Sequence, residues 1–398
     1  MSKESLEGLR METLMIHAGH SADPATRALA APIYQTATFG FDTVDEMDSS
    51  WDRTGLVYCR EGNPTVYALQ DKLAAMEGGE AALCASSGMG AICSTLLTVL
   101  RRGDHLLCSE EVFSHSGVFV KELLCDKMGI DVSYADFRDV ENVMQNIRSN
   151  TAVLFTETPS NPSLGVVNIE AIGRVAKEND CLLIVDSTFA PPPIQRPLSL
   201  GADMVVHSLT KYINGHGDVI AGFIIGKADF IGQCRMFGLK DMTGAVMSPF
   251  NAFLIARGLK TLDIRMERHC ANAKALADFF VHHPAVKEVY YPGLENFQGH
   301  EIAKKQMSDF GGMMSIELNA SRDAVAAALN KLQMVTIAVS LGDAETLVEH
   351  PASMTHSTYS PEELAAAGIS EGLVRISAGL ENVEDIIADF KAILDTLI

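Results

Sequence analysis

The feature that most constrains this fold is a regular alternation of short apolar runs and helix-periodic segments between residues 65 and 226. Apolar runs such as Ala81–Ala85 predict strands buried on both faces, whereas Thr65–Met76 spaces its apolar residues as a helix does. Strands of this kind, separated by helices, indicate a mostly parallel sheet that helices cover on both faces. The predicted strands are Ala81–Ala85, His105–Cys108, Ile130–Tyr134, Ala152–Thr156, Leu182–Val185, Met204–His207 and Ile220–Ile225, and the predicted helices are Thr65–Met76, Met89–Leu100, Ser116–Met128, Val140–Ile147 and Ile169–Lys177.

The pattern changes after about residue 226, where helical segments follow one another and strands become sparse. The helices predicted there are Phe230–Met236, Asn251–Leu262, Asn272–His283, Arg322–Leu332 and Val383–Leu397, and the strands are Met313–Leu318, expected to be half-buried, and Val374–Ala378. Residues 1–62 carry loop signals and little periodicity, so we expect an extended arm there. The sequence therefore predicts an α/β protein with an arm (1–62), a large, mostly parallel sheet domain (63–257) and a smaller α+β domain (258–398).

Composition restricts the partners and the location of the protein. The chain has 31 Lys and Arg against 51 Asp and Glu, and its net charge of −20 argues against nucleic acid or an anionic membrane as a partner. The uncharged run Ala81–Leu100 approaches the length of a membrane span, but its Ser-Ser-Gly interruption favours a strand, a tight turn and a helix. The 8 cysteines form no CxxC pair, and the N-terminus lacks the pattern of a signal peptide. We therefore expect a cytoplasmic protein with free thiols and no metal site.

Polar residues follow several of the predicted strands at the point where each strand ends. In an open α/β sheet, ligands bind beyond the carboxyl ends of the strands, so these residues are candidates for a site. The predicted strand Ala81–Ala85 is followed by the sequence SSGMG, which opens a predicted helix. The small residues of this sequence and the free N–H groups at the start of the helix suit an anion. The residues concerned are Gly88 and Met89, Glu157 and Asn161, Asp186, and Ser208, Thr210 and Lys211.

This combination of residues suggests pyridoxal 5'-phosphate as the cofactor. The cofactor needs a lysine for a Schiff base, an acid to keep its pyridine nitrogen protonated, and amides and hydroxyls for its phosphate. Lys211, Asp186 and the hydroxyls of Ser208 and Thr210 meet these needs if the strands are neighbours. Each residue alone also has a structural explanation, such as a capping aspartate or a solvated lysine, so the prediction depends on their combination.

Motifs along nearly the whole chain identify a family. They are APIYQTATF, YCREGNPT, ASSGMGA, ETPSNP, IVDSTF, GADMVVHSLTKYINGHGD, GLKDMTGA, RGLKTLDIRMERH, VSLGDAETLVEHPASMTH and GLVRISAGLEN. Through them the chain resembles the Cys/Met-metabolism enzymes that use pyridoxal phosphate, a branch of the fold-type-I, aspartate aminotransferase-like proteins. The motif VHSLTKY is specific to the family as a whole, and within the family the chain is most similar to lyases that cleave methionine.

The resemblance implies a role for each matching residue. Lys211 would form the Schiff base and move protons between the substrate carbons and the cofactor, and Asp186 would pair with the pyridinium. The remaining implied roles are phosphate binding by Gly88, Met89, Ser208 and Thr210, phosphate binding in a neighbouring subunit by Tyr58 and Arg60, substrate carboxylate binding by Arg375 with Ser340, contact with the cofactor's phenolic oxygen by Asn161, and support around the leaving group by Lys240 and Asp241. Sharing of Tyr58 and Arg60 between subunits implies at least a dimer, and usually a homotetramer. Glu157 has either a structural or a functional role.

The chain also departs from the family pattern near the leaving group. Lyases of the family usually have Leu-Tyr-Gly-Cys-Thr where this chain has Val112-Phe113-Ser114-His115-Ser116. Phe113 can stack on the cofactor ring but cannot donate a proton. Histidine as a residue type can act as an acid near neutral pH, so His115 is either a candidate acid or a loop residue without a chemical role. Ser187 stands where the methionine-cleaving lyases usually have Asn. These changes bear on substrate specificity and turnover and leave the cofactor prediction intact.

The resemblance implies α,γ-elimination on a small sulfur amino acid, with methionine or homocysteine giving a thiol, 2-oxobutanoate and ammonia. Val339 stands where cystathionine γ-lyases commonly have Glu, and its apolar side chain suits an uncharged thioether tail. Three alternatives stay open. They are a cystathionine γ-lyase or cysteine desulfhydrase, a γ-replacement enzyme acting on an O-acylhomoserine, and a binding protein that keeps the cofactor site as a relic.

Overall fold

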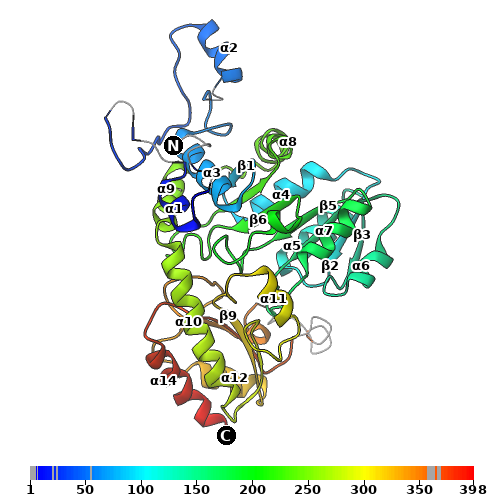
Figure 1. Cartoon of the computed structure of the whole chain (residues 1–398), viewed down its shortest axis with the longest axis vertical. Coiled ribbons are helices and arrows are strands. Elements are labelled where there is room, and N and C mark those ends of the chain that lie inside the picture. The colour runs from blue at the N-terminus through cyan, green and yellow to red at the C-terminus, as the bar shows by residue number, and fades with distance from the viewer. Residues whose placement is uncertain are drawn as a thin grey trace.

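The computed structural model describes residues 6, 8–19, 22–23, 26–53, 56–355, 364 and 369–398, and it contains two sheets (Figure 1). The larger sheet has seven strands in the order β1-β7-β6-β5-β4-β2-β3, and the smaller has five in the order β10-β11-β12-β9-β8. All seven strands of the larger sheet come from residues 81–226, and all five of the smaller from residues 286–377. The predicted class, a mostly parallel sheet domain followed by a smaller α+β domain, is confirmed. The predicted boundaries at 62/63 and 257/258 stay predictions.

The larger sheet brings the carboxyl ends of most of its strands to one edge. Strands β2, β3, β4, β5 and β6 pair in parallel, and β7 runs antiparallel to both β1 and β6, so that β1 points the same way as β6. The strand bounds are β1 Ala81–Ala85, β2 His105–Ser109, β3 Asp131–Ala135, β4 Thr151–Glu157, β5 Leu182–Asp186, β6 Met204–Ser208 and β7 Gly222–Gly226. Six of these strands deviate from the prediction by one or two residues at an end.

Helices cover both faces of this sheet, as the continuously apolar strands predict. One face buries alternate strand residues such as Val185 and Val205 against α3, α7 and α9, and the other buries Ile184 and Val206 against α4 and α8. The helix bounds are α3 Pro64–Glu77, α4 Gly88–Val99, α5 Ser114–Val118, α6 Val140–Asn146, α7 Ile169–Glu178, α8 Ala228–Gln233 and α9 Pro249–Leu259, with wider π-helical turns at Phe119–Cys125 and Cys234–Thr243. The uncharged run at 81–100 forms β1 and α4, as predicted.

The smaller domain packs its sheet on α10 and α14 around a separate apolar core. Its elements are α10 Leu262–Val281, β8 Val286–Tyr290, α11 His300–Gln306, β9 Met313–Leu318, α12 Arg322–Leu329, β10 Thr336–Ile337, β11 Leu347–Glu349, β12 Leu373–Ser377 and α14 Val383–Leu394, with short 3₁₀ turns at Pro351–Ser353 and Asp395–Leu397. The prediction that β9 is half-buried is wrong, because all six of its residues are buried. Its second face meets the larger domain, where Ser315 Oγ donates to the Pro162 carbonyl at 2.8 Å.

The N-terminal segment differs from the predicted extended arm, because it contains helices α1 (Met11–His17) and α2 (Val44–Arg53). Helix α1 is too short to be stable alone, and tertiary packing holds it in place. Leu14 and Met15 are buried, and Lys72 Nζ of α3 donates to the Met15 carbonyl at 2.6 Å. Helix α2 extends from the body at the top of Figure 1. The segment's first residues, on which the signal-peptide prediction depends, and His356 at the end of one family motif lie outside the described residues.

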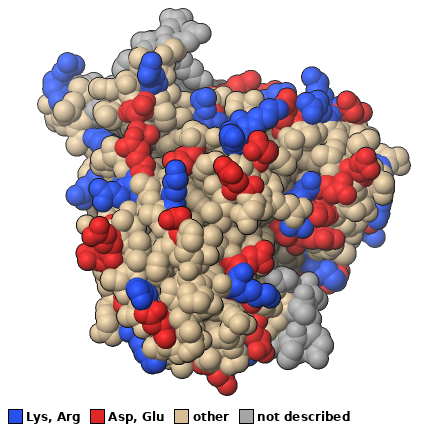
Figure 2. Space-filling view, turned by 60° about the horizontal axis from the view of Figure 1, so that its bottom comes forward, with Lys and Arg blue, Asp and Glu red and all other residues tan. Residues whose placement is uncertain are grey.

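Charged side chains of both signs are interspersed over the face that Figure 2 shows, and the net charge of −20 is not gathered there into one patch. Among the residues that the structure describes, no helix combines the length and apolar character needed to cross a bilayer.

Candidate active site

A cavity of about 280 Å³, called the inner cavity, lies at the edge of the larger sheet where the parallel strands end. It is lined by Ser87, Gly88 and Met89 after β1, Phe113 after β2, Glu157 and Asn161 after β4, Asp186 and Thr188 after β5, and Ser208, Thr210 and Lys211 after β6. The smaller domain closes it with Val339, Leu341 and Arg375. The structure therefore brings nine of the predicted site residues to one cavity: Gly88, Met89, Phe113, Asn161, Asp186, Ser208, Thr210, Lys211 and Arg375.

Lys211 is a largely buried amine in the turn after β6. It lies three residues beyond the end of that strand, and its Nζ donates to Ser340 Oγ of the smaller domain at 3.0 Å. Burial, and then the nearby positive charge of Arg375, lower the pKa of Lys211 from 10.5 to about 8. A large fraction of this amine is therefore neutral at mildly alkaline pH, which is the form that attacks a carbonyl. Ser340, predicted at the substrate carboxylate, contacts this amine.

Asp186 is a buried carboxyl at the end of β5, and its pKa reflects two opposed causes. Burial raises the pKa above its ordinary value, and hydrogen bonds from Thr188 lower it. Its Oδ1 accepts from the Thr188 hydroxyl at 2.6 Å and from the Thr188 N–H at 3.0 Å. The same Thr188 hydroxyl accepts from the Ser208 N–H at 2.9 Å, so one threonine joins the ends of β5 and β6. A buried carboxyl with its oxygen fixed in this way suits a cationic partner in the cavity.

The start of α4 forms a narrow cradle against the end of β6. Ser87 caps the helix, with its Oγ accepting from the Gly90 N–H at 2.9 Å, and this leaves the first N–H groups of the helix for a ligand. A Cβ on Gly88 would lie only 2.9 Å from Ser208 Cβ, so only glycine allows this close approach. Thr210 is held beside the cradle by two hydrogen bonds between its hydroxyl and the backbone of Ala221.

Arg375 is nearly fully buried and has four partners that fix its guanidinium. Its Nη1 donates to Asn161 Oδ1 at 3.0 Å, and its Nη2 donates to the Val339 and Ser340 carbonyls. Nη2 also forms an ion pair with Glu349 Oε2 at 2.5 Å. Burial lowers the pKa of Arg375, and Glu349 counteracts that effect. An arginine held in this way can bind a carboxylate at a fixed position.

The chemistry of the residues in the inner cavity fits pyridoxal phosphate. The glycine cradle at Gly88 suits a phosphate, the carboxyl of Asp186 suits a protonated ring nitrogen, and the amine of Lys211 suits the aldehyde. The cofactor would supply a conjugated ring that takes up electrons from the substrate. The role of each residue stays a prediction.

Six predicted residues do not line the inner cavity: Ser340, which contacts the Lys211 amine, and Tyr58, Arg60, His115, Lys240 and Asp241. Tyr58 is exposed with the Arg60 guanidinium over its ring at 5.6 Å, and Lys240 forms an ion pair with Glu61 at 3.7 Å, so these residues gather at a second place on the chain. Asp241 is exposed and lies beside Lys240 in sequence. His115 is also exposed, and its ring stacks on Phe113 with centroids 5.1 Å apart.

An outer cavity of about 570 Å³ adjoins the inner one, because Phe113, Asn161, Val339 and Arg375 line both. Its walls come from the loops after β2 and β4 and from the smaller domain. His115 lines neither cavity.

Two residues near the site have an environment that the sequence did not reveal. Glu349 is the buried partner of Arg375. The only feature of the sequence that could have indicated this is a single carboxylate at the end of the mostly apolar run TLVE. Ser187, a departure from the family pattern, is buried away from the cavity, where its Oγ donates to the Ala190 carbonyl at 2.9 Å. Ser187 lines neither the inner cavity nor the outer cavity described above.

The fold and the site define a fold-type-I pyridoxal-phosphate enzyme. The chain matches the family described as Cys/Met metabolism PLP-dependent enzyme over residues 12–395, and it belongs to that family. It is 48% identical over 402 residues to an L-methionine gamma-lyase of Treponema denticola, with 100% of each chain covered. It is 52% identical over 388 residues to an L-methionine gamma-lyase of Fusobacterium nucleatum subsp. polymorphum, covering 97% of this chain and 98% of that one. The crystal structure of metB from Corynebacterium glutamicum is similar with a TM-score of 0.92 and 37% identity, covering 99% of this chain and 100% of the other.

Proposed function

We propose that this enzyme removes the γ-substituent of a sulfur amino acid, methionine or homocysteine, as a thiol. With methionine, the substrate and one water would give methanethiol, 2-oxobutanoate and ammonia. The observation that carries the proposal is the inner cavity, where the Lys211 amine lies among a carboxyl for the cofactor ring, a phosphate cradle and Arg375. The choice of leaving group is supported by the two relatives, 48% and 52% identical, that are named L-methionine gamma-lyase.

The residues of the chain then have distinct tasks. Bound pyridoxal phosphate eases the loss of protons next to the amino group by taking up electrons. Arg375 binds the substrate carboxylate through its guanidinium and orients the α-carbon towards Lys211. Lys211 Nζ, whose pKa is lowered to about 8, accepts the α-proton and then moves protons at the neighbouring carbon. Ser340 Oγ holds this amine in place at 3.0 Å.

Part of the wall of the inner cavity is apolar, whereas the outer cavity also has charged side chains such as Lys121 and Glu317. Val339 lines both cavities, and Leu341 and Ile220 line the inner one. Side chains of this kind provide no partner for the distal ammonium and carboxylate of cystathionine, whereas they suit a short thioether. This wall supports methionine or homocysteine over cystathionine as the preferred substrate.

We further propose a cytoplasmic homo-oligomer, a tetramer built from two active dimers. Tyr58 and Arg60 lie outside the inner cavity of their own chain, and Tyr58 is 44% exposed. These residues are available to complete the phosphate site of a neighbouring subunit. The 8 cysteines are all free thiols, which is typical of a reducing compartment.

A product assay over a small substrate panel tests the proposal. The holoenzyme would be incubated with methionine, homocysteine, cystathionine, cysteine, and O-acetylhomoserine plus sulfide, and keto acids and thiols would be quantified. We expect 2-oxobutanoate from methionine and homocysteine at the highest kcat/KM. Preference for cystathionine or cysteine would indicate the related lyases, and homocysteine formed from O-acetylhomoserine would indicate γ-replacement. A cofactor absorbance band that no amino acid changes would indicate a binding protein.

A further inference from the structure

Glu157 is a buried carboxyl in the inner cavity to which the proposed chemistry assigns no task. It ends β4, is 5% exposed, and lies opposite Asp186 in the register of β4 and β5. Its Oε2 accepts a hydrogen bond from the Phe113 N–H at 2.7 Å, and its Oε1 accepts one from the Asn161 N–H at 3.2 Å. One carboxyl therefore holds two residues that line the cavity and belong to different loops.

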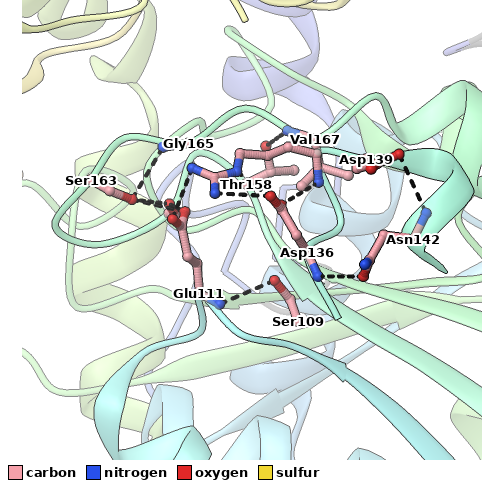
Figure 3. A network of polar contacts seen from close by, with 11 residues as sticks. Ser109, Glu111, Asp136, Asp139, Asn142, Thr158, Ser163, Gly165 and Val167 are labelled. Atoms are coloured by element: carbon pink, nitrogen blue, oxygen red, sulfur yellow. Dashed lines mark hydrogen bonds and ion pairs between the residues drawn. The ribbon is translucent and has the colours of Figure 1, made fainter. Parts of the chain in front are cut away.

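The two loops carry different parts of the site. Phe113 presents its ring to the inner cavity, and Asn161 accepts a hydrogen bond from Arg375 through its side-chain oxygen. The same loops are also joined further out by Glu111, whose Oε2 accepts from Ser160 Oγ at 2.7 Å and from Ser163 Oγ at 2.9 Å. Figure 3 shows that Glu111 belongs to a polar network that reaches Asp136 and Asn142. Glu157 is thus the inner, and Glu111 the outer, of two carboxyls that connect the loops.

The ionisation of Glu157 decides whether both of its hydrogen bonds exist. An ionised carboxylate accepts at both oxygens, whereas a protonated carboxyl turns one oxygen into a hydroxyl donor. Burial, and then the charge of Asp186, raise the pKa of Glu157 well above its ordinary value of 4.5, and the two N–H groups partly oppose this. The other charged groups that interact with it are Glu111 and Arg375.

We propose that Glu157 is a positioning residue whose ionised carboxylate holds Phe113 and Asn161 together. The clamp keeps the stacking ring and Arg375 in a fixed relation across the inner cavity. Uptake of a proton by Glu157 weakens one of the two N–H bonds, so Asn161 and Arg375 lose their alignment and the substrate binds less well. The inference rests on the proposed function only in taking Arg375 as the group that binds the substrate carboxylate.

The test is Glu157→Gln in the holoenzyme, because glutamine keeps the shape and one acceptor but faces the second N–H with a donor. We expect KM for the amino acid to rise about tenfold and kcat to change less than about threefold, from the loss of one hydrogen bond to a charged group. The acid limb of kcat/KM against pH should also lose the step that Glu157 contributes and keep the step near pH 8 that Lys211 contributes, because only the carboxyl has been removed.

A second readout uses apo-protein and needs no turnover. A carboxyl whose pKa is raised in the folded state stabilises the fold at low pH, and this contribution is lost as pH rises from about 4.5 through the raised value. The apparent unfolding temperature of the apo-protein should therefore fall with pH in that window for the wild type and fall less for Glu157→Gln. Protonation of Glu157 is therefore expected to stabilise the fold and to weaken substrate binding.

The matched control is Glu381→Gln. Glu381 also bridges two segments, accepting from the Thr346 N–H at 2.6 Å and from the Thr346 hydroxyl at 2.7 Å, but it lines neither cavity. An unchanged KM and acid limb in Glu157→Gln, or the same changes in Glu381→Gln, would overturn the proposal. If Glu157→Gln does not fold, Glu157→Asp should keep the acid limb and raise KM, and absence of both effects would also overturn it. If no substrate turns over, the apo-protein readout still tests Glu157, so failure of the proposed function is distinguishable.

Discussion

Removing the charge of Glu349 is expected to expose how strongly the site depends on one buried ion pair. Glu349 and Arg375 are 2% and 5% exposed, and their charged atoms are 2.5 Å apart. At an effective dielectric constant of about 20, two unit charges at this separation attract by about 7 kcal/mol before desolvation is counted. Glu349→Gln keeps a hydrogen-bond acceptor beside the arginine, which retains about 2 kcal/mol of that attraction. We therefore expect a net loss of about 5 kcal/mol of unfolding free energy, at the upper end of the range of about 3–5 kcal/mol for breaking a buried pair.

The assay is urea unfolding of apo-protein at one fixed protein concentration, with Arg375→Gln and the double variant completing a cycle. The double variant should lose less than the sum of the two single variants, by about 2 kcal/mol or more, because it leaves no uncompensated buried charge. The surface pair of Lys391 and Asp395 is a matched control, since it has the same separation of 2.5 Å but both side chains are about half exposed. Asp395→Asn should leave the unfolding free energy nearly unchanged, because solvent screens the charges of an exposed pair. A loss in Glu349→Gln no larger than in this control would refute the argument that burial sets the strength of the pair.

Three further predictions follow from the site. The rate at which apo-protein captures the cofactor should rise with pH up to about 8 and then level off, because the neutral amine of Lys211 reacts. Lys211→Ala should show no visible absorbance band of covalently held cofactor, and a band in that variant would contradict the assigned role. His115→Ala should lower elimination less than about tenfold, since His115 is exposed and lines neither cavity, whereas a fall of about 10²-fold would support the alternative that it donates a proton. Thr188→Val should raise the pKa of Asp186 and weaken cofactor binding about tenfold in an equilibrium titration, and an unchanged dissociation constant would show that the 2.6 Å hydrogen bond does not matter.

The larger sheet was predictable because its strands are continuously apolar and lie between helices. The run Leu182–Val185 has no polar residue, and Met204–His207 has one only at its last position, so neither alternates as a strand with one solvated face does, and burial on both faces was the consistent interpretation. The residues after these strands, Asp186 and Lys211, could be placed at one edge for the same reason. The register that sets Glu157 beside Asp186 could not be predicted, because it depends on how β4 and β5 pair.

The smaller domain and the arm were harder to predict, because their patterns depend on tertiary contacts. Strand β9 alternates in sequence like a half-solvated strand, yet its polar Ser315 is buried against the Pro162 carbonyl of the other domain. Helix α1 has only 7 residues and depends on α3 for its stability. The buried partner of Arg375 was missed because Glu349 meets it only across the pairing of β11 and β12.

The central claim, that the cavity around Lys211 supports γ-elimination on a thioether amino acid, is tested most directly by following methionine with the holoenzyme. Methanethiol and 2-oxobutanoate would be quantified together over time, with Lys211→Ala as the control. We predict equal amounts of the two products from the wild type and neither from the variant. Absence of 2-oxobutanoate from both methionine and homocysteine would contradict the claim.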